Sequence, residues 1–283
     1  PDSGATVYQT WEWNRAWWQA FGKGKALRLL MVHDGPDLVG LAPFYVRKHL
    51  GTPLRRLAFV GTGVSDYLHV LAADGVERPV FAEVCRYLVY GRGFDFADLQ
   101  QLPETSRFAD YLRRNAAGGC SGSTNGSGRH VMARPMELCP YLPLPTTWEE
   151  FLRRLSKRMR ANIGYYTRLA HRDLPEVSFE LCKGEAIPEA MTALFRLHQR
   201  RWRSRMLPGV LGSRSVRGFH YEVAERFHER GWLRLHIVRG AGTIVAALYC
   251  FNYRNRYYYY LGGFEPELGK YSLGTTLTAE AIR

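Results

Sequence analysis

The sequence predicts an α/β or α+β fold that is built as two related halves. Strand-like runs of alternating apolar residues are separated by segments with helical periodicity in each half. The two halves share a gapless alignment of strand residues, Leu27-Arg28-Leu29, Val32 and Val39 in the first with Leu233-Arg234-Leu235, Val238 and Val245 in the second. In both copies a third strand ends in glycine, at Gly61 and Gly262. The matching order of predicted strands and helices in the two halves favours internal duplication. We place the halves at residues 1–145 and 146–283.

The first half opens with tryptophans and phenylalanine at helical spacing over residues 11–21, which is typical of a helix packed into a core. Two alternating runs, 27–32 and 38–46, flank Asp34-Gly35, which is the turn signal of a β-hairpin. The elements expected after the hairpin are a strand at 57–60, a helix at 78–90, a strand at 94–99, a helix at 105–115, a Gly/Ser/Asn-rich linker at 116–128 and a strand-like segment at 131–138.

The second half begins at a capping-box pattern, Thr147 and Glu150, which predicts a helix over residues 147–171. The elements expected after it are a strand at 177–182, helices at 188–203 and 216–230, a hairpin of 233–238 with 244–253, a third strand at 256–262 and a terminal helix that begins at Ser272. We expect Ser272 to be the N-cap of this helix.

The composition predicts a globular protein of the cytoplasm. Hydrophobic residues make up 46% of the chain, and no apolar run reaches the ~18 residues of a membrane span. Residues 1–9 lack the basic and apolar regions of a signal peptide. The five cysteines are scattered without CxxC or metal-ligand spacing, which favours a reducing compartment and predicts no metal site.

The net charge of +13 predicts a phosphorylated ligand or an anionic partner. Nucleic acid, an anionic membrane face and coenzyme A are all negatively charged and therefore fit this prediction. The predicted helix 147–171 has an apolar stripe and an opposite basic face, formed by Arg153, Arg154, Lys157, Arg160, Arg168 and Arg172. This face is either simply solvated or a binding surface for tRNA or a membrane. Asn162 falls within the apolar stripe, where its amide needs a hydrogen-bond partner from the protein or from a substrate.

Well-known nucleotide and hydrolase motifs are absent. The sequence contains no P-loop, GxGxxG, HExxH, GxSxG or Cys/His zinc spacing, which argues against kinases, Rossmann dehydrogenases, zincins and α/β-hydrolases. Small residues at the start of the terminal helix, with Lys270 nearby, indicate an anion site that fits the pyrophosphate of coenzyme A. An ordinary loop and helix start explains the same residues.

Several segments together resemble a known family. They are Trp232-Leu-Arg-Leu235, Val245-Ala-Ala-Leu-Tyr249, Tyr257-Tyr-Tyr-Tyr-Leu-Gly-Gly-Phe264, Ser272-Leu-Gly274 with Leu277, Leu38-Val-Gly-Leu-Ala-Pro-Phe44, Gly63 with Ser65-Asp66-Tyr67, Leu155-Ser-Lys-Arg158, Leu197-His198 and Arg201-Trp202. The chain resembles, over nearly its whole length, the GNAT-like acetyltransferases of the CelD/BcsL type. These proteins are linked to bacterial cellulose and exopolysaccharide loci and are relatives of the FemAB transferases.

The resemblance implies a tandem GNAT-like fold, each half a mixed, mostly antiparallel sheet flanked by helices. It implies transfer of an acetyl or other acyl group from acyl-CoA to an amine or hydroxyl acceptor, with no metal. The residues that match the donor-binding strand and phosphate loop are Leu261, Gly262, Gly263, Lys270, Ser272, Leu273, Gly274 and Thr275. The loop matches the family pattern, Arg/Gln-x-x-Gly-x-Gly/Ala, only in part. We expect the family's further strand and helix, which often supplies a tyrosine acid, to follow Arg283.

Direct attack on a thioester needs a base for the acceptor. Asp66 follows a glycine turn at the end of a predicted strand and is a candidate for this role, although a turn-forming Asp explains it equally. His198, on an apolar helix face, is the second candidate, with a buried core histidine as the alternative. We assign Tyr67, Asn162, Trp202 and Tyr259 to the acceptor substrate. We expect one functional cleft, in the second half and facing Asp66.

Three functions remain open at this point. The first is an acyl-CoA-dependent acyltransferase acting on an amine or hydroxyl, for example in polysaccharide or envelope biosynthesis. The second is a FemAB-like, aminoacyl-tRNA-dependent transferase that uses the basic helix as its tRNA track. The third is a non-catalytic binding protein that keeps the fold. RNA binding falls steeply with salt, which distinguishes the second from the first.

Overall fold

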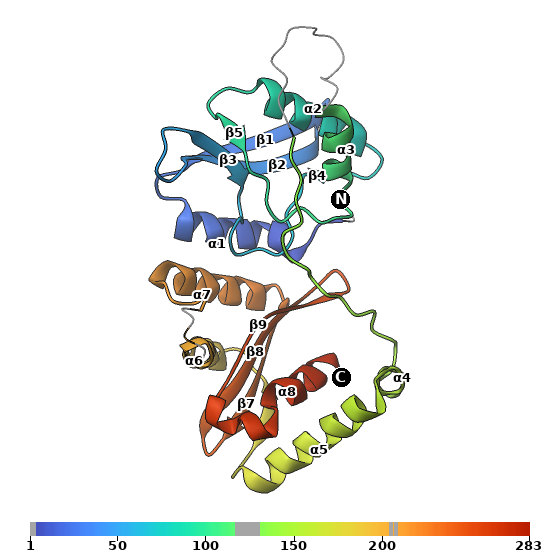
Figure 1. Ribbon diagram of the computed structural model, residues 1–283, viewed down its shortest axis with the longest axis vertical. Coiled ribbons are helices and arrows are strands. Elements are labelled where there is room, and N and C mark those ends of the chain that lie inside the picture. The colour runs from blue at the N-terminus through green and yellow to red at the C-terminus, as the bar shows by residue number, and fades with distance from the viewer. Residues whose placement is uncertain (1–3, 117–130, 204–205, 207–208) are drawn as a thin grey trace. The chain divides into compact units, whose positions relative to one another are not determined.

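The computed structural model describes residues 4–116, 131–203, 206 and 209–283. The chain divides into two compact units, Pro1–Cys139 and Pro140–Arg283, and each is described by itself (Figure 1). Each unit contains a β-sheet flanked by helices, which confirms the predicted α/β fold class. The predicted linker at 116–128 lies, apart from Ala116, outside the described residues.

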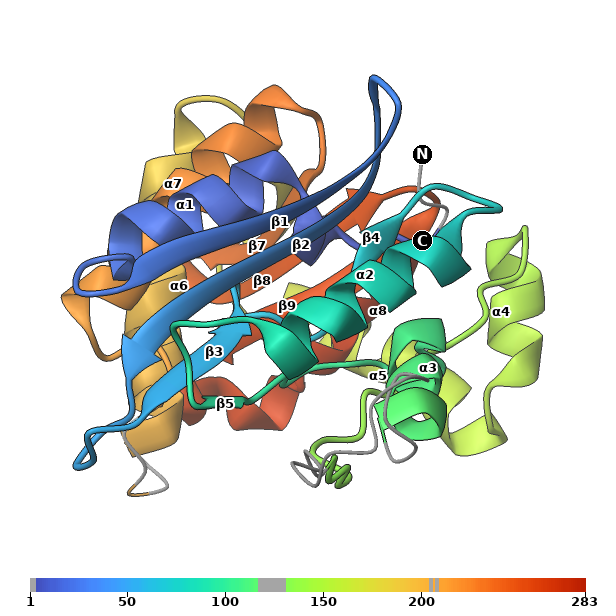
Figure 2. The same cartoon turned by 90° about the horizontal axis from the view of Figure 1, so that it is seen from above.

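The first unit contains η1 (Val7–Gln9), α1 (Trp11–Phe21), β1 (Ala26–Asp34), β2 (Asp37–Lys48), β3 (Arg55–Phe59), β4 (Leu71–Ala72), α2 (Glu77–Tyr90), β5 (Phe96–Ala97) and α3 (Arg107–Ala116). Its sheet has the order β1-β2-β3-β5, with β4 paired to β2. Thr10 begins α1 by accepting a hydrogen bond from the Trp13 amide. Figure 2 shows β1 and β2 as a long hairpin, and Gly35 supplies the positive φ of its turn.

The second unit contains α4 (Trp148–Arg154), α5 (Lys157–Asp173), β6 (Ser178–Leu181), α6 (Ala186–Arg203), α7 (Arg214–Glu229), β7 (Leu233–Gly240), β8 (Thr243–Tyr253), β9 (Arg256–Phe264), η2 (Pro266–Tyr271) and α8 (Leu273–Ile282). Its strands pair antiparallel in the order β6-β7-β8-β9. Leu248 and Cys250 pack with Leu273 and Leu277 of α8 on one face of this sheet. Gly263 of β9 meets α6 on the other face.

The single helix predicted over 147–171 is wrong, because two helices meet at Leu155 and Ser156. Leu155 has extended backbone angles (φ −76°, ψ 150°), and the Ser156 side chain accepts the Met159 amide at the start of α5. The Arg160 guanidinium donates to the carbonyl oxygens of Leu152, Arg153 and Leu155. A cation therefore covers the carbonyl end of α4, where the helix dipole favours positive charge.

Three other local predictions need correction. Residues 131–138 form no strand, because their backbone has no ladder partner and all of them are exposed. The strand predicted at 94–99 is reduced to Phe96–Ala97, which pairs parallel to β3. Ser272 holds the N-cap position of α8, but its side chain caps no amide, since its own backbone is left-handed (φ 46°, ψ 43°).

Gly263 sets the approach of α6 to β9, so we expect Gly263→Ala to destabilise the protein. An added Cβ would lie 2.6 Å from the backbone nitrogen of His198 and 2.9 Å from Cβ of Leu197. Overpacking against a helix backbone costs about 1–3 kcal/mol. Urea unfolding measures this cost. Gly218→Ala on α7 is the matched control, because its Cβ meets no atom within 4 Å and a helical alanine is favoured over glycine. Equal stability of the two variants would contradict the packing argument.

Candidate functional site

A cavity of about 460 Å³ lies in the second unit, between the sheet and the helices on one of its faces. Phe151, Leu155, Met159 and Ile163 line it from α4, α5 and the turn between them. Ala246, Ala247 and Leu248 of β8 and Tyr259, Gly262, Gly263 and Phe264 of β9 form its floor. The remaining lining residues are Arg201 of α6 and Gly274, Thr275, Leu277, Thr278, Ala279 and Ile282 of α8. Its size is that of a small-molecule site.

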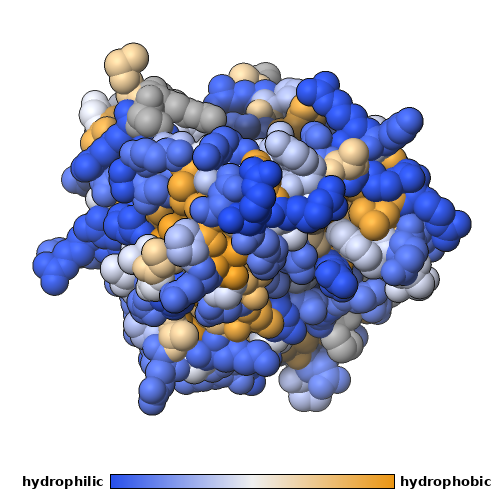
Figure 3. All heavy atoms as spheres, turned by 90° about the horizontal axis from the view of Figure 1, so that it is seen from below, coloured by the Kyte–Doolittle hydropathy of each residue, from blue (hydrophilic) through white to orange (hydrophobic). Residues whose placement is uncertain are grey.

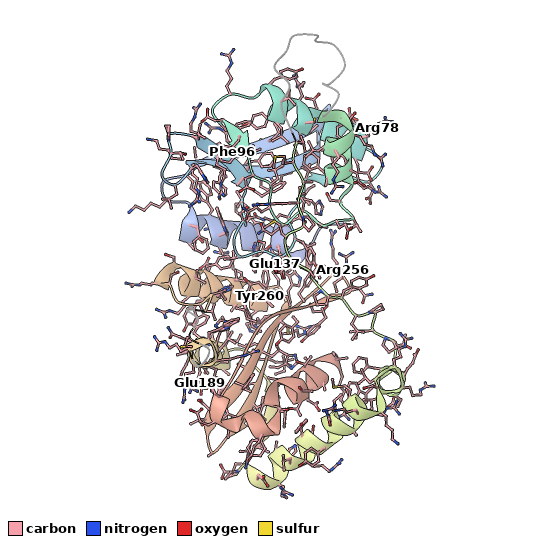
Figure 4. The ribbon with its side chains drawn as sticks, in the orientation of Figure 1. Arg78, Phe96, Glu137, Glu189, Arg256 and Tyr260 are labelled. Atoms are coloured by element: carbon pink, nitrogen blue, oxygen red, sulfur yellow. The ribbon has the colours of Figure 1, made fainter. Side chains whose placement is uncertain are left out.

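Strand β9 carries a β-bulge beside this cavity. Tyr249 pairs with Leu261 and Cys250 pairs with Tyr259, so Tyr260 is the extra residue. Figure 4 labels Tyr260 on β9, and its ring contacts His220 with 5.2 Å between ring centroids. A bulge bends its strand and is common next to active sites. Here it falls three residues before Gly263, on the last strand in the order of the described sheet.

The N-terminus of α8 borders the same cavity through Gly274 and Thr275. The left-handed Ser272 turns the chain into the helix, and its carbonyl oxygen accepts the amides of Thr275 (2.9 Å) and Thr276 (3.2 Å). The first amides of a helix have no acceptor within the helix, and the helix dipole is positive at this end. The geometry therefore offers an anion-binding helix end beside two glycines of β9, of which Gly262 is partly exposed and Gly263 is buried against α6.

Four of the predicted donor-binding residues, Gly262, Gly263, Gly274 and Thr275, line the cavity together with Tyr259. The others do not line it: Leu261 belongs to β9, Ser272 caps α8 and Leu273 is buried in the core with Leu277. The Lys270 ammonium lies 4.7 Å from the centroid of the Tyr271 ring, away from the lining. A hydrogen bond with Tyr271 raises the pKa of Lys270.

His198 and Trp202 lie one turn apart on α6 and do not line the cavity. The Trp202 indole donates a hydrogen bond to Nε2 of His198 (2.8 Å), and His198 is only 3% exposed. Burial, followed by the charge of Arg201, lowers the pKa of His198 to about 4. The imidazole is therefore neutral near pH 7, and a base role at Nε2 would require Trp202 to give up its hydrogen bond. The assignment of His198 as a base stays a prediction.

Asn162 is half-buried on α5, next to the lining residue Ile163. It is itself not among the residues that line the cavity. Its assignment to the acceptor substrate stays a prediction as well.

Asp66 and Tyr67 belong to the first unit, whereas the cavity belongs to the second. The Tyr8 hydroxyl donates to Oδ2 of Asp66. The preceding Ser65 accepts a hydrogen bond from the Trp13 indole (2.9 Å) and donates to the Gly61 carbonyl (2.9 Å). Partial desolvation by the surrounding protein raises the pKa of Asp66, and the Tyr8 hydrogen bond acts in the opposite direction. This carboxylate is a stronger proton acceptor than an ordinary one, and its place in a shared cleft stays a prediction.

The site assignments made from sequence did not include Arg201, the one charged residue among the described residues that line the cavity. Its guanidinium lies 5.0 Å from the centroid of the Phe264 ring, in a cation–π contact. Neighbouring arginines fix α6 to the segment after β9, because Arg196 and Arg200 pair with Glu265 and Arg200 also pairs with Glu267. Arg201 follows His198 by three residues and Leu197 by four, so helical spacing places all three on one side of α6. This spacing could have identified Arg201 from the sequence.

In the part of the chain that the structure describes, no three or more His, Cys, Asp or Glu side chains form a cluster that could hold a metal ion. Within the same residues, no helix combines the length and the hydrophobicity that a membrane crossing requires.

A family model matches the second unit, and solved structures are similar to the chain over both units. Residues 157–283, from α5 to α8, match the family model described as an acetyltransferase (GNAT) domain. The structure of FemX is similar, with a TM-score of 0.61 and 11% identity, over 100% of this chain and 80% of FemX. A conserved protein of unknown function from Bacteroides thetaiotaomicron VPI-5482 is similar with a TM-score of 0.53 and 11% identity, over 96% and 77% of the two chains. No curated protein matches. At this identity the structural likeness concerns the fold alone.

The buried His198 makes a testable contribution to the pH dependence of stability. Unfolded His198 binds a proton near pH 6.5, whereas the folded residue binds one only near pH 4. The unfolded state therefore binds more protons between these values, and the free energy of unfolding falls as the pH is lowered through this window. We expect His198→Gln to reduce that fall by up to about 3 kcal/mol. Urea unfolding at pH 7 and at pH 4.5 measures it, and identical pH dependence in both proteins would contradict the burial argument.

Proposed function

We propose that this protein is an acyltransferase that moves an acyl group from coenzyme A to an amine or hydroxyl acceptor. The observation that carries the proposal is the cavity between the bulged strand β9 and the N-terminus of α8. It lies largely within the residues that match the acetyltransferase (GNAT) domain. The match supports the transferase chemistry, and the geometry supports the donor site.

The donor would be held mainly by backbone groups in this proposal. Gly262 lines the cavity, is partly exposed and has no side chain, so the pantetheine arm of the donor can lie against the backbone of β9 at this position. The amides that begin α8, next to Gly274, would bind the pyrophosphate, because a helix N-terminus favours anions. Arg201 adds a positive charge to the lining. Lys270 would act at longer range.

Direct transfer needs no covalent enzyme intermediate. The acceptor nitrogen or oxygen attacks the thioester carbonyl, the carbon–sulfur bond breaks, and coenzyme A leaves as a thiolate, which takes up a proton to become the thiol. A base takes the acceptor's proton. We propose Asp66 for this role, because burial raises its pKa while the Tyr8 hydrogen bond fixes one carboxylate oxygen. Tyr259, which lines the cavity, would contact the acceptor. An acceptor from polysaccharide or envelope biosynthesis is proposed from the family resemblance.

The outer face of α5 favours a second candidate, a transferase with an anionic macromolecular partner such as tRNA or a membrane surface. Residues 140–283 hold 23 Lys and Arg against 13 Asp and Glu, so this unit carries +10 of the net charge of +13. On α5, Lys157, Arg158 and Arg168 form no ion pair with any described residue. Tyr165 is exposed among them at 53%. Such a face attracts phosphate groups.

Isothermal titration with CoA and acetyl-CoA tests the donor site. We expect saturable binding at micromolar concentration and a loss of at least about tenfold in Gly274→Val, since the added side chain occupies the helix end that binds the anion. Gly269→Val is the matched control, because a Cβ at Gly269 meets nothing within 4 Å and Gly269 does not line the cavity. Absence of binding to every coenzyme A species would favour the tRNA-dependent or the non-catalytic function.

The second candidate predicts tight, salt-sensitive binding of bulk tRNA or of phosphatidylglycerol vesicles. Charge reversal of Lys157, Arg158 and Arg168 together to Glu should weaken binding at least about tenfold at physiological salt, with a shallower salt dependence. The control reverses Lys183, Arg203 and Arg214, which are exposed, lie outside α5 and change the net charge equally. Equal losses in both triple variants would show only a general charge effect and would contradict a specific surface on α5.

A further inference from the structure

One wall of the donor cavity is apolar. Phe151, Leu155, Met159 and Ile163 face it from the α4–α5 segment, and Leu277 and Ile282 face it from α8. Met159 is 43% exposed, so this wall reaches the molecular surface. On the face drawn in Figure 3, apolar residues form a broken strip that hydrophilic residues enclose. The apolar wall is therefore open to solvent at Met159.

Different elements supply the polar and the apolar groups of the lining. The start of α8 at Gly274 and Thr275 offers partners for an anion, and the backbone of β9 at Gly262 offers partners for amide groups. Thr278 also lines the cavity, but its hydroxyl already donates to the Gly274 carbonyl (2.7 Å). The six side chains of the apolar wall contain no hydrogen-bond donor, and their one acceptor is the weak thioether sulfur of Met159. Polar amides of a pantetheine arm gain nothing from that wall, whereas an alkyl chain gains the burial of its surface.

The wall is also long. Its part on α8 runs from Leu277 to Ile282, which corresponds to about 7.5 Å of helix axis at 1.5 Å per residue. An acetyl group has a single methyl carbon beyond its carbonyl and leaves most of this wall in contact with water. The wall therefore fits a longer acyl group.

We propose that the donor carries a medium- or long-chain acyl group, whose alkyl chain lies against the apolar wall formed by α4, α5 and α8. This inference rests on the proposed function and specifies its substrate class. Full burial of each methylene strengthens binding about fourfold. Octanoyl-CoA should therefore bind at least tenfold more tightly than acetyl-CoA, even when only part of its chain is buried.

Isothermal titration of the full chain with CoA, acetyl-CoA and octanoyl-CoA, below the micelle concentration, tests this. A rise of tenfold or more from acetyl-CoA to octanoyl-CoA supports the inference. Equal affinities for the two overturn the chain-length inference and leave the acyltransferase proposal standing. No affinity for any of the three, CoA included, overturns both.

Two variants distinguish the wall from unspecific apolar binding. Ile163→Phe adds a ring inside the cavity and should lower octanoyl-CoA affinity at least fivefold, and by a larger factor than it lowers acetyl-CoA affinity. Ala161→Phe adds the same ring on the exposed side of α5 and should change neither. Thr278→Phe blocks the same space from α8 and replaces Ile163→Phe if that variant does not fold by circular dichroism. Unchanged octanoyl-CoA affinity in a folded blocking variant would show that the chain does not lie there, and would overturn the inference.

Discussion

The close approach of α6 to β9 at Gly263 is the contact on which the rest of the second unit depends. A helix backbone lies against a strand backbone there, with no room for a side chain between them. This contact fixes α6 across the sheet, and the ion pairs of Arg196 and Arg200 with Glu265 hold the chain just after the strand. Arg201 is thereby placed at the cavity, and His198 is held against the sheet. One missing side chain thus positions both a charged lining residue and a buried imidazole.

The break between α4 and α5 has a comparable effect on the opposite face of the sheet. Ser156 starts a new helix and Arg160 covers the carbonyl end of the old one, so the change of direction uses ordinary capping interactions. The apolar side of both helices then faces the cavity, while the cations of α5 face the solvent. The donor wall and the basic surface are two sides of one helical segment, which means that a ligand and a macromolecular partner could be recognised without competing for residues.

Local sequence patterns predicted most of the secondary structure. Each hairpin combines an alternation of apolar and polar residues in its strands with a turn signal between them, such as Asp34-Gly35. They did not predict the break at Leu155, since Phe151, Leu155 and Met159 keep helical spacing through it. They wrongly predicted a strand at 131–138, because alternation does not supply a ladder partner. In the site, Gly262 and Gly274 could be named from the resemblance. The apolar wall could not, because a cavity results from packing between segments that are distant in the sequence, and the burial that lowers the pKa of His198 arises in the same way.

The left-handed backbone at Ser272 has an evolutionary consequence. This conformation is reached readily by glycine and by a few small polar residues, and it is costly for β-branched side chains. The hydroxyl of Ser272 caps no amide, so selection at this position would act on the backbone angle and not on the hydroxyl. Related sequences should therefore exchange serine with glycine, asparagine or aspartate here, whatever their donor. Variation at position 272 would then be a poor marker of substrate change, whereas variation along the apolar wall would be an informative one.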